Sequence, residues 1–259
     1  MTDEPQTTEL RIPTSDGAVL EGYLARPTNA SSASTPGVLL LHGFPSGAVW
    51  AEHIGADLPE LASRCATEMG WIALALRFRG CGSSTGNFSL GGWVEDVRAG
   101  LAALRSEGHP DRVWVCGFGT GGSVGLVAAA DDPDVAGVAM IGAPADFEDW
   151  SRNNKRLLAH AHQVGAIKDQ HFPTDLAQWN RELSTIRAVD AAERLSPRPL
   201  FLLHGAADEV VPQVDARIVA EAHGAGELRL ISGAGHLLRH DPRAIAVLLG
   251  WLARSRNAV

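Results

Sequence analysis

The sequence predicts a single α/β domain with a mostly parallel sheet, an antiparallel hairpin near its N-terminal end and helices on both faces. Short runs of consecutive apolar residues alternate with longer amphipathic stretches, an order that is typical of strands separated by helices. The short runs are apolar on both faces, as expected where helices cover a sheet on two sides. The length of 259 residues suits one such domain.

Each expected element has a place along the chain. Two alternating stretches, 9–13 and 19–26, flank a turn at residues 15–17 and predict the antiparallel hairpin. The continuous apolar runs predict further strands at residues 37–41, 71–76, 113–116, 138–141, 200–203 and 228–231. The amphipathic stretches between them predict helices at residues 50–68, 92–106, 120–130, 213–223 and 242–255.

The alternation is interrupted at residues 145–198, where the sequence predicts two or three helices. We expect this insertion, within a single domain of residues 1–259, to form a small helical cap over the carboxyl ends of the strands. Open α/β sheets bind their ligands at that edge. Trp150 and Trp179 are candidates for lining an apolar pocket there. The alternative is that both side chains belong to the core of the cap.

Charge and cysteine content restrict the partners and the compartment. The net charge of −8 argues against nucleic acid and anionic membranes, which need clustered Lys and Arg. The three cysteines (Cys65, Cys81 and Cys116) form no disulfide framework, which favours a reducing cytoplasm. The N-terminal residues resemble no secretory signal, and no apolar run reaches the roughly 20 residues that a membrane helix requires.

No cofactor is predicted. His160 and His162 are two residues apart, so a helix would place them on different faces and a shared metal ion is not expected. No glycine-rich phosphate loop followed by lysine is present, which argues against nucleotide binding. The sequence does not indicate an oligomeric state.

Chemistry-bearing motifs follow the expected strands in a fixed order. Residues 42–47 read HGFPSG, residues 79–84 read RGCGSS and residues 117–121 read GFGTG. Two later strand ends carry Asp208, in HGAADEVVP, and His236, in SGAGH. In this order, the motifs resemble those of the α/β-hydrolase superfamily, in particular its small serine esterases and acyl-peptidases. The resemblance extends over nearly the whole chain.

The resemblance implies the α/β-hydrolase fold and assigns roles to individual residues. Asp208 and His236 match the acid and the histidine of a catalytic triad. They follow residues 117–121, which match the nucleophile elbow, the strand-to-helix turn that carries the nucleophile in this family. Asp146, at the end of the preceding strand, is an alternative acid. The backbone N–H groups of Phe44 and Thr120 match the two donors of an oxyanion hole.

Gly119 stands where the family pattern Gly-x-Ser-x-Gly places the nucleophilic serine. Glycine has no side chain that could attack a carbonyl carbon, and it relaxes the strained backbone of the elbow. The alternative nucleophiles are Ser46, Thr120, Ser123 and Cys116. Ser46 and Cys81 are also candidates for lining the pocket, because both lie in the loops that follow strands.

Three functions agree with a glycine at this position. The first is a pseudo-hydrolase that binds a small acyl or carbonyl ligand. The second is a hydrolase or lyase-type enzyme in which His236, oriented by Asp208, acts as a general base on water or substrate. The third is a serine esterase that carries an engineered Ser-to-Gly inactivation at residue 119.

Overall fold

The computed structural model describes residues 4–28, 35–46 and 50–257 and contains an eight-stranded sheet in the order β1-β2-β4-β3-β5-β6-β7-β8. The strands are β1 (Gln6–Pro13), β2 (Val19–Arg26), β3 (Gly37–Leu41), β4 (Ile72–Arg77), β5 (Val113–Phe118), β6 (Val135–Ile141), β7 (Leu200–Gly205) and β8 (Glu227–Ile231). β2 pairs antiparallel with both β1 and β4, whereas the pairs from β4 to β8 are parallel. The predicted fold class is confirmed.

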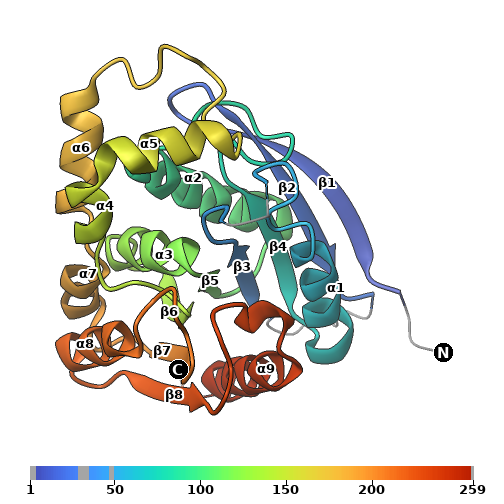
Figure 1. Ribbon diagram of the computed structural model, residues 1–259. Helices are drawn as coiled ribbons and strands as arrows, with labels where there is room; N and C mark the ends of the chain where they lie inside the picture. Colours follow the sequence, from blue (N-terminus) through green and yellow to red (C-terminus); the bar gives the residue numbers. More distant parts are fainter. Residues whose placement is uncertain (1–3, 29–34, 47–49, 258–259) are drawn as a thin grey trace.

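Helices cover the sheet on both faces (Figure 1). The α-helices are α1 (Leu58–Met69), α2 (Leu90–Ala103), α3 (Thr120–Ala130), α4 (Glu148–Arg152), α5 (Asn154–Gln163), α6 (Leu176–Thr185), α7 (Ala188–Leu195), α8 (Gln213–His223) and α9 (Pro242–Asn257). Alternate residues of a strand point to opposite faces. In β3, Leu39 therefore packs into the core with α2, α3, α7 and α8, whereas Leu40 packs into the core with α1 and α9.

The first helix begins later than predicted. Residues 51–57 form turns, and α1 starts at Leu58 rather than at residue 50. Pro59 lies in the first turn of α1, where its missing N–H and fixed φ are tolerated. The positive φ of Gly55, 73°, breaks the stretch that was expected to be helical.

Residues 145–198, which were predicted to form the cap, contain more helices than expected, and these helices do not form a single layer. Helices α4, α5 and α6 follow the carboxyl end of β6 and lie together on one side of the molecule in Figure 1. Helix α7 instead packs against α3 and α8, beside the sheet. Within the part of the chain that the structure describes, no helix combines the length and apolar character needed to cross a bilayer.

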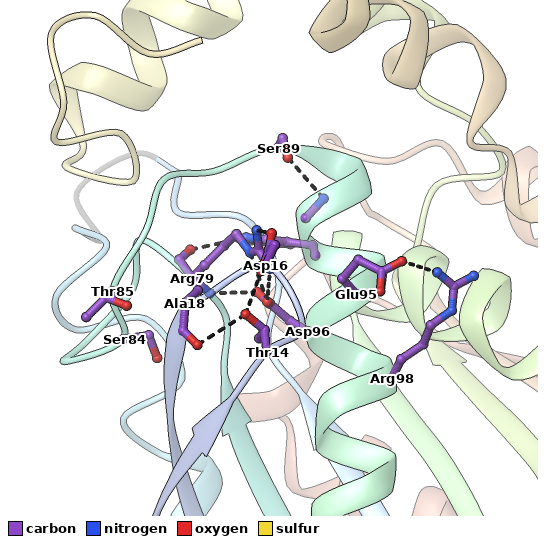
Figure 2. A network of polar contacts seen from close by, with 12 residues as sticks. Thr14, Asp16, Ala18, Arg79, Ser84, Thr85, Ser89, Glu95, Asp96 and Arg98 are labelled. Atoms are coloured by element: carbon purple, nitrogen blue, oxygen red, sulfur yellow. Dashed lines mark hydrogen bonds and ion pairs between the residues drawn. The ribbon is translucent and has the colours of Figure 1, made fainter. Parts of the chain in front are cut away.

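The motif at residues 79–84 forms a buried ionic connection, shown in Figure 2. Arg79 donates from Nε to Asp96 of α2 at 2.9 Å and from a terminal nitrogen to Asp16 of the β1–β2 turn at 2.6 Å. The hydrogen bond from Arg79 lowers the pKa of Asp16 to about 2. Burial raises the pKa of Asp96 to about 6, against the effect of Arg79. Arg79 thus joins the hairpin, the end of β4 and α2.

Candidate active site

Gly119 forms the sharp turn between β5 and α3. Its φ of 53° and ψ of −132° lie in a region that residues with a Cβ atom adopt only under strain. The turn is fixed by hydrogen bonds from the Gly119 N–H to the carbonyl of Ile141 at 2.8 Å and from the Gly122 N–H to the carbonyl of Gly119 at 2.9 Å. The backbone therefore has the shape of a nucleophile elbow, with no side chain at its tip.

The glycines on either side of the turn allow backbones to approach closely. A Cβ atom on Gly117 would lie 2.4 Å from the carbonyl oxygen of Gly121. One on Gly121 would lie 2.1 Å from the carbonyl oxygen of His42, at the end of β3. Neither distance is tolerated by a real side chain, so both positions require glycine for the start of α3 to pack against β5 and β3.

Asp208 and His236 form a hydrogen-bonded pair. The Nδ1 of His236 lies 2.9 Å from Oδ2 of Asp208. Oδ1 of Asp208 accepts hydrogen bonds from the N–H groups of Val210 and Val211, both at 2.9 Å, and the carboxylate is fully buried. Since a carboxylate accepts hydrogen bonds, the proton of a neutral His236 lies on Nδ1. Its Nε2 is then free to accept a proton.

The imidazole of His236 is directed at the elbow. A Cβ atom built on Gly119 would lie 3.8 Å from Nε2 of His236 and 3.5 Å from the Cα of Gly43, both ordinary van der Waals distances. A small side chain at residue 119 would therefore fit beside the imidazole. The predicted proximity of Gly119, His236 and Asp208 is present, and their catalytic roles stay predictions.

The alternative acid has other contacts. Oδ1 of Asp146 accepts a hydrogen bond from the N–H of Glu148 at 3.0 Å. Its Oδ2 lies 3.7 Å from a guanidinium nitrogen of Arg187. Asp146 thus contacts the first residue of α4 and Arg187, whereas Asp208 contacts the imidazole. The geometry favours Asp208 as the partner of His236.

Gly205 brings the loops of Asp208 and His236 together. A Cβ atom at this position would lie 2.4 Å from the carbonyl oxygen of Gly235 and 2.5 Å from that of Ala234. We expect Gly205→Ala to push residues 234–236 away and to separate His236 from Asp208 beyond hydrogen-bond distance. A crystal structure of the variant measures that separation.

Gly235→Ala is the matched control, because its Cβ atom would meet only the carbonyl oxygen of Ala207, at 3.8 Å. This variant is expected to keep the pair intact. An unchanged distance between His236 and Asp208 in Gly205→Ala would show that another contact positions the histidine loop.

The two expected oxyanion donors come from adjacent segments. A Cβ atom on Gly43 would lie 3.1 Å from the carbonyl oxygen of Phe118, so the loop after β3 rests directly on the elbow. Phe44 follows Gly43, and its ring contacts Trp150 with centroids 5.2 Å apart. Thr120 is the first residue of α3, where N–H groups have no acceptor within the helix. Their role as an oxyanion hole stays a prediction.

His42 is a buried structural residue. Its Nδ1 lies 2.7 Å from the carbonyl oxygen of Gly43, and its Nε2 accepts a hydrogen bond from the N–H of Phe78 at 3.1 Å. Burial lowers the pKa of His42 to about 4, so the ring is neutral at pH 7. Both ring nitrogens are occupied, which leaves none for catalysis.

Of the alternative nucleophiles, Ser123 and Cys116 are engaged in the fold. Ser123 donates its hydroxyl to the carbonyl of Pro144 at 2.7 Å. Cys116 is fully buried, and burial raises the pKa of its thiol. Ser46 is exposed in the loop after β3. Thr120 is buried at the start of α3.

Two expected pocket residues are corrected by the structure. Cys81 has no exposed surface, and burial raises the pKa of its thiol. Trp179 is buried, and its indole N–H donates to the carbonyl of Phe88 at 3.3 Å. Both side chains are parts of the core, which for Trp179 is the alternative considered from the sequence. Trp150 is half-buried beside Phe44 and remains a candidate for the pocket wall.

Two histidines near the site were missed from the sequence. His160 of α5 lies with Nε2 3.2 Å from the carbonyl oxygen of Pro45, which connects the cap to the loop after β3. His204, at the end of β7, lies 3.4 Å from Oδ2 of Asp208. The only sequence signal for His204 is its place in the same strand-end motif as Asp208. Among the residues that the structure describes, no cluster of His, Cys, Asp and Glu could hold a metal ion.

The comparisons with known proteins agree with this fold. Residues 38–248 match the model of the alpha/beta hydrolase family. The chain resembles the structure of Est1E from Butyrivibrio proteoclasticus with bound ferulic acid, with a TM-score of 0.73, 20% identity and coverage of 95% of this chain and 96% of that one. An esterase from Pyrococcus furiosus matches with a TM-score of 0.67 and 19% identity, over 96% of this chain and 91% of that one. The uncharacterized protein YfhR of Escherichia coli O157:H7 is 22% identical over 227 residues, which are 86% of this chain and 70% of YfhR.

Proposed function

Because this chain belongs to the alpha/beta hydrolase family, we propose that it is a pseudo-hydrolase, which binds a small acyl or carbonyl ligand without forming an acyl-enzyme. The observation that carries the proposal is Gly119 at the tip of the elbow, facing Nε2 of His236. Covalent catalysis in this fold requires a side-chain nucleophile at that point. Glycine has none, whereas the hydrogen-bonded pair of His236 and Asp208 lies beside it.

The groups around Gly119 suit a ligand with a carbonyl oxygen. The first N–H groups of α3 carry a partial positive charge that favours an electron-rich oxygen. The half-buried ring of Phe44 contacts those of Trp150 and His160. Together the three rings would form an aromatic wall of the proposed ligand site. Est1E binds ferulic acid, an aromatic carboxylic acid. Aromatic acids and their esters are therefore the first ligands to test.

Binding is tested by the thermal stability of the protein with ferulic acid, methyl ferulate and butyrate. A ligand that binds only the folded state raises Tm in a concentration-dependent way. The shift should disappear in His236→Asn, which changes the ring facing Gly119. His109→Asn is the matched control, because His109 is exposed before β5, at the opposite edge of the sheet, and Asn tolerates its positive φ of 55°. No shift with any of the three compounds contradicts the proposed ligand class.

Absence of a nucleophile has its own test. We expect a fluorophosphonate, which reacts with activated serine hydroxyls, to leave the mass of the protein unchanged in intact-protein mass spectrometry. The reason is that Gly119 offers no hydroxyl to His236. A stoichiometric adduct would show that Ser46 or Thr120 serves as a nucleophile, and peptide mapping would identify which.

A second candidate function is hydrolysis by direct attack of water. It is favoured by the position of His236. Apart from the residues next to Gly119 in the chain, only its Nε2 and the Cα of Gly43 among the described residues lie within 4 Å of the Cβ position of residue 119. His236 would take a proton from water as the water attacks an activated ester, and Asp208 would stabilise the resulting imidazolium. Slow hydrolysis of p-nitrophenyl acetate that is lost in His236→Ala supports this function. Turnover that survives the substitution excludes it.

A further inference from the structure

His204 is a buried histidine with one ring nitrogen left unpaired. It lies near the end of β7 and is 1% exposed. Its Nε2 is 2.9 Å from the carbonyl oxygen of Val211 and 3.4 Å from Oδ2 of Asp208. Within the described part of the chain, its Nδ1 has no hydrogen-bond partner. Neither the triad nor the proposed ligand site uses this ring.

The contacts of His204 define where its proton lies. A carbonyl oxygen only accepts hydrogen bonds, so Nε2 must carry the hydrogen that is shared with Val211. A second proton on Nδ1 would be buried without an acceptor, which is unfavourable. The Nε2–H of His204 is therefore directed at the carbonyl of Val211, and the ring lies close to the carboxylate of Asp208.

This N–H acts on the loop that holds the acid. The peptide N–H of Val211 donates to Oδ1 of Asp208, while the carbonyl of the same residue accepts the hydrogen bond from His204. Val211 is thus held by hydrogen bonds on both its N–H and its carbonyl. Oδ2 of Asp208, which lies 3.4 Å from Nε2 of His204, is the oxygen that receives Nδ1–H of His236.

We propose that His204 is a positioning residue that sets the orientation of Asp208, and through it that of His236. The role rests on the proposed function, in which His236 faces the bound ligand. Without the Nε2–H of His204, the carbonyl of Val211 loses its partner and the segment from Asp208 to Val211 is free to turn. Asp208 then keeps fewer of its donors, and the imidazole of His236 is no longer held toward Gly119.

The proposal is tested with two amide substitutions of similar polarity. In His204→Gln the side-chain amide reaches the place of Nε2 and still donates to Val211. In His204→Asn the shorter amide reaches only the place of Nδ1 and does not. Crystal structures of both variants measure the distance between His236 and Asp208, and NMR follows the strongly deshielded Nδ1–H proton of His236 in the full-length protein.

We expect His204→Gln to keep the 2.9 Å contact and the proton signal of His236, and His204→Asn to lose both. Affinity for a ligand identified by thermal shift should fall about tenfold in His204→Asn alone. If no ligand binds the unsubstituted protein, the proposed function fails, while the distance and the proton signal still decide the role of His204. That role would be overturned if His204→Asn kept the contact between His236 and Asp208 together with both backbone hydrogen bonds from Val210 and Val211 to Asp208.

A measurement on the unsubstituted protein covers the case in which His204→Asn does not fold. Nitrogen-15 NMR of the histidine rings distinguishes a proton on Nε2 from one on Nδ1. A proton on Nε2 of His204 supports the assignment. A proton on Nδ1 removes the hydrogen bond to Val211 and contradicts the proposal.

Discussion

Replacing Gly119 with serine is expected to produce a protein that hydrolyses small activated esters, with a burst of product from acyl-enzyme formation. The gain over the unsubstituted protein should be at least about 10³-fold in kcat, because a triad works as a unit and a missing nucleophile removes most of its effect. Stopped-flow and steady-state assays with p-nitrophenyl butyrate measure the burst and the turnover.

The geometry provides the reason. The Cβ atom of the new serine would lie 3.8 Å from Nε2 of His236, so its hydroxyl can rotate to hydrogen-bond distance from that nitrogen. The Nδ1–H of His236 stays hydrogen-bonded to Asp208, and Nε2 can take the proton of the serine hydroxyl as the oxygen attacks the carbonyl carbon. The expected N–H donors of Phe44 and Thr120 would then hold the oxyanion.

Two matched variants separate chemistry from folding. Gly119→Ser should lose about 1–3 kcal/mol of unfolding free energy, because a residue with a Cβ atom must adopt the φ of 53° that glycine enters freely. Gly119→Ala should lose a similar amount and gain no activity. Gly119→Ser/His236→Ala should fold like the single variant and show no burst. A folded Gly119→Ser with neither burst nor turnover would mean that the histidine–aspartate pair lacks catalytic geometry.

Much of this architecture could be predicted from the sequence because local patterns determine it. The helices at residues 120–130 and 213–223 begin and end where expected. Each lies between short apolar runs that form strands, so both ends are marked. The elbow could be located for the same reason, since Gly117 and Gly121 flank Gly119 after such a run.

The remaining features depend on contacts between distant residues. Nothing local distinguishes Trp150, which is half-buried, from Trp179, which donates to the carbonyl of Phe88 in the core. The role of His204 requires knowing that the chain returns at Val211 to accept its hydrogen bond. Arg79 could be located in a glycine-rich motif, but its partners in the hairpin turn and in α2 become visible only in the folded chain.

The second large effect concerns stability, and it involves Arg79. We expect Arg79→Ala to lower the unfolding free energy by about 3–5 kcal/mol, because removing one partner of a buried ion pair leaves the other charge uncompensated. The carboxylate left behind is that of Asp96, whose side chain is fully buried. Urea unfolding at pH 7, followed by circular dichroism, measures the change.

Arg98→Ala is the control from the same part of the molecule (Figure 2). Arg98 pairs with Glu95 and Asp131, and all three side chains are at least 40% exposed. Exposed pairs contribute about 0–1 kcal/mol, so this variant should unfold close to the unsubstituted protein. A loss in Arg98→Ala as large as that in Arg79→Ala would contradict the role of burial.

The pH dependence of Arg79→Ala tests whether the unpaired carboxylate is the cause. Burial already raises the pKa of Asp96 to about 6 in the presence of Arg79, and loss of the arginine should raise it further. An unfolded aspartate titrates near 3.8, so the folded variant binds the proton at higher pH than the unfolded chain does. Lowering the pH from 7 toward 4 therefore stabilises the folded variant through this group. The deficit of Arg79→Ala, which is its loss of unfolding free energy relative to the unsubstituted protein, should shrink.

The double variant Arg79→Ala/Asp96→Asn carries no charge at either position. At pH 7 it should regain part of the unfolding free energy lost in Arg79→Ala, and lowering the pH should not reduce its remaining deficit. A deficit in Arg79→Ala that stays constant over this pH range would assign the loss to packing of the arginine side chain rather than to the buried charge of Asp96.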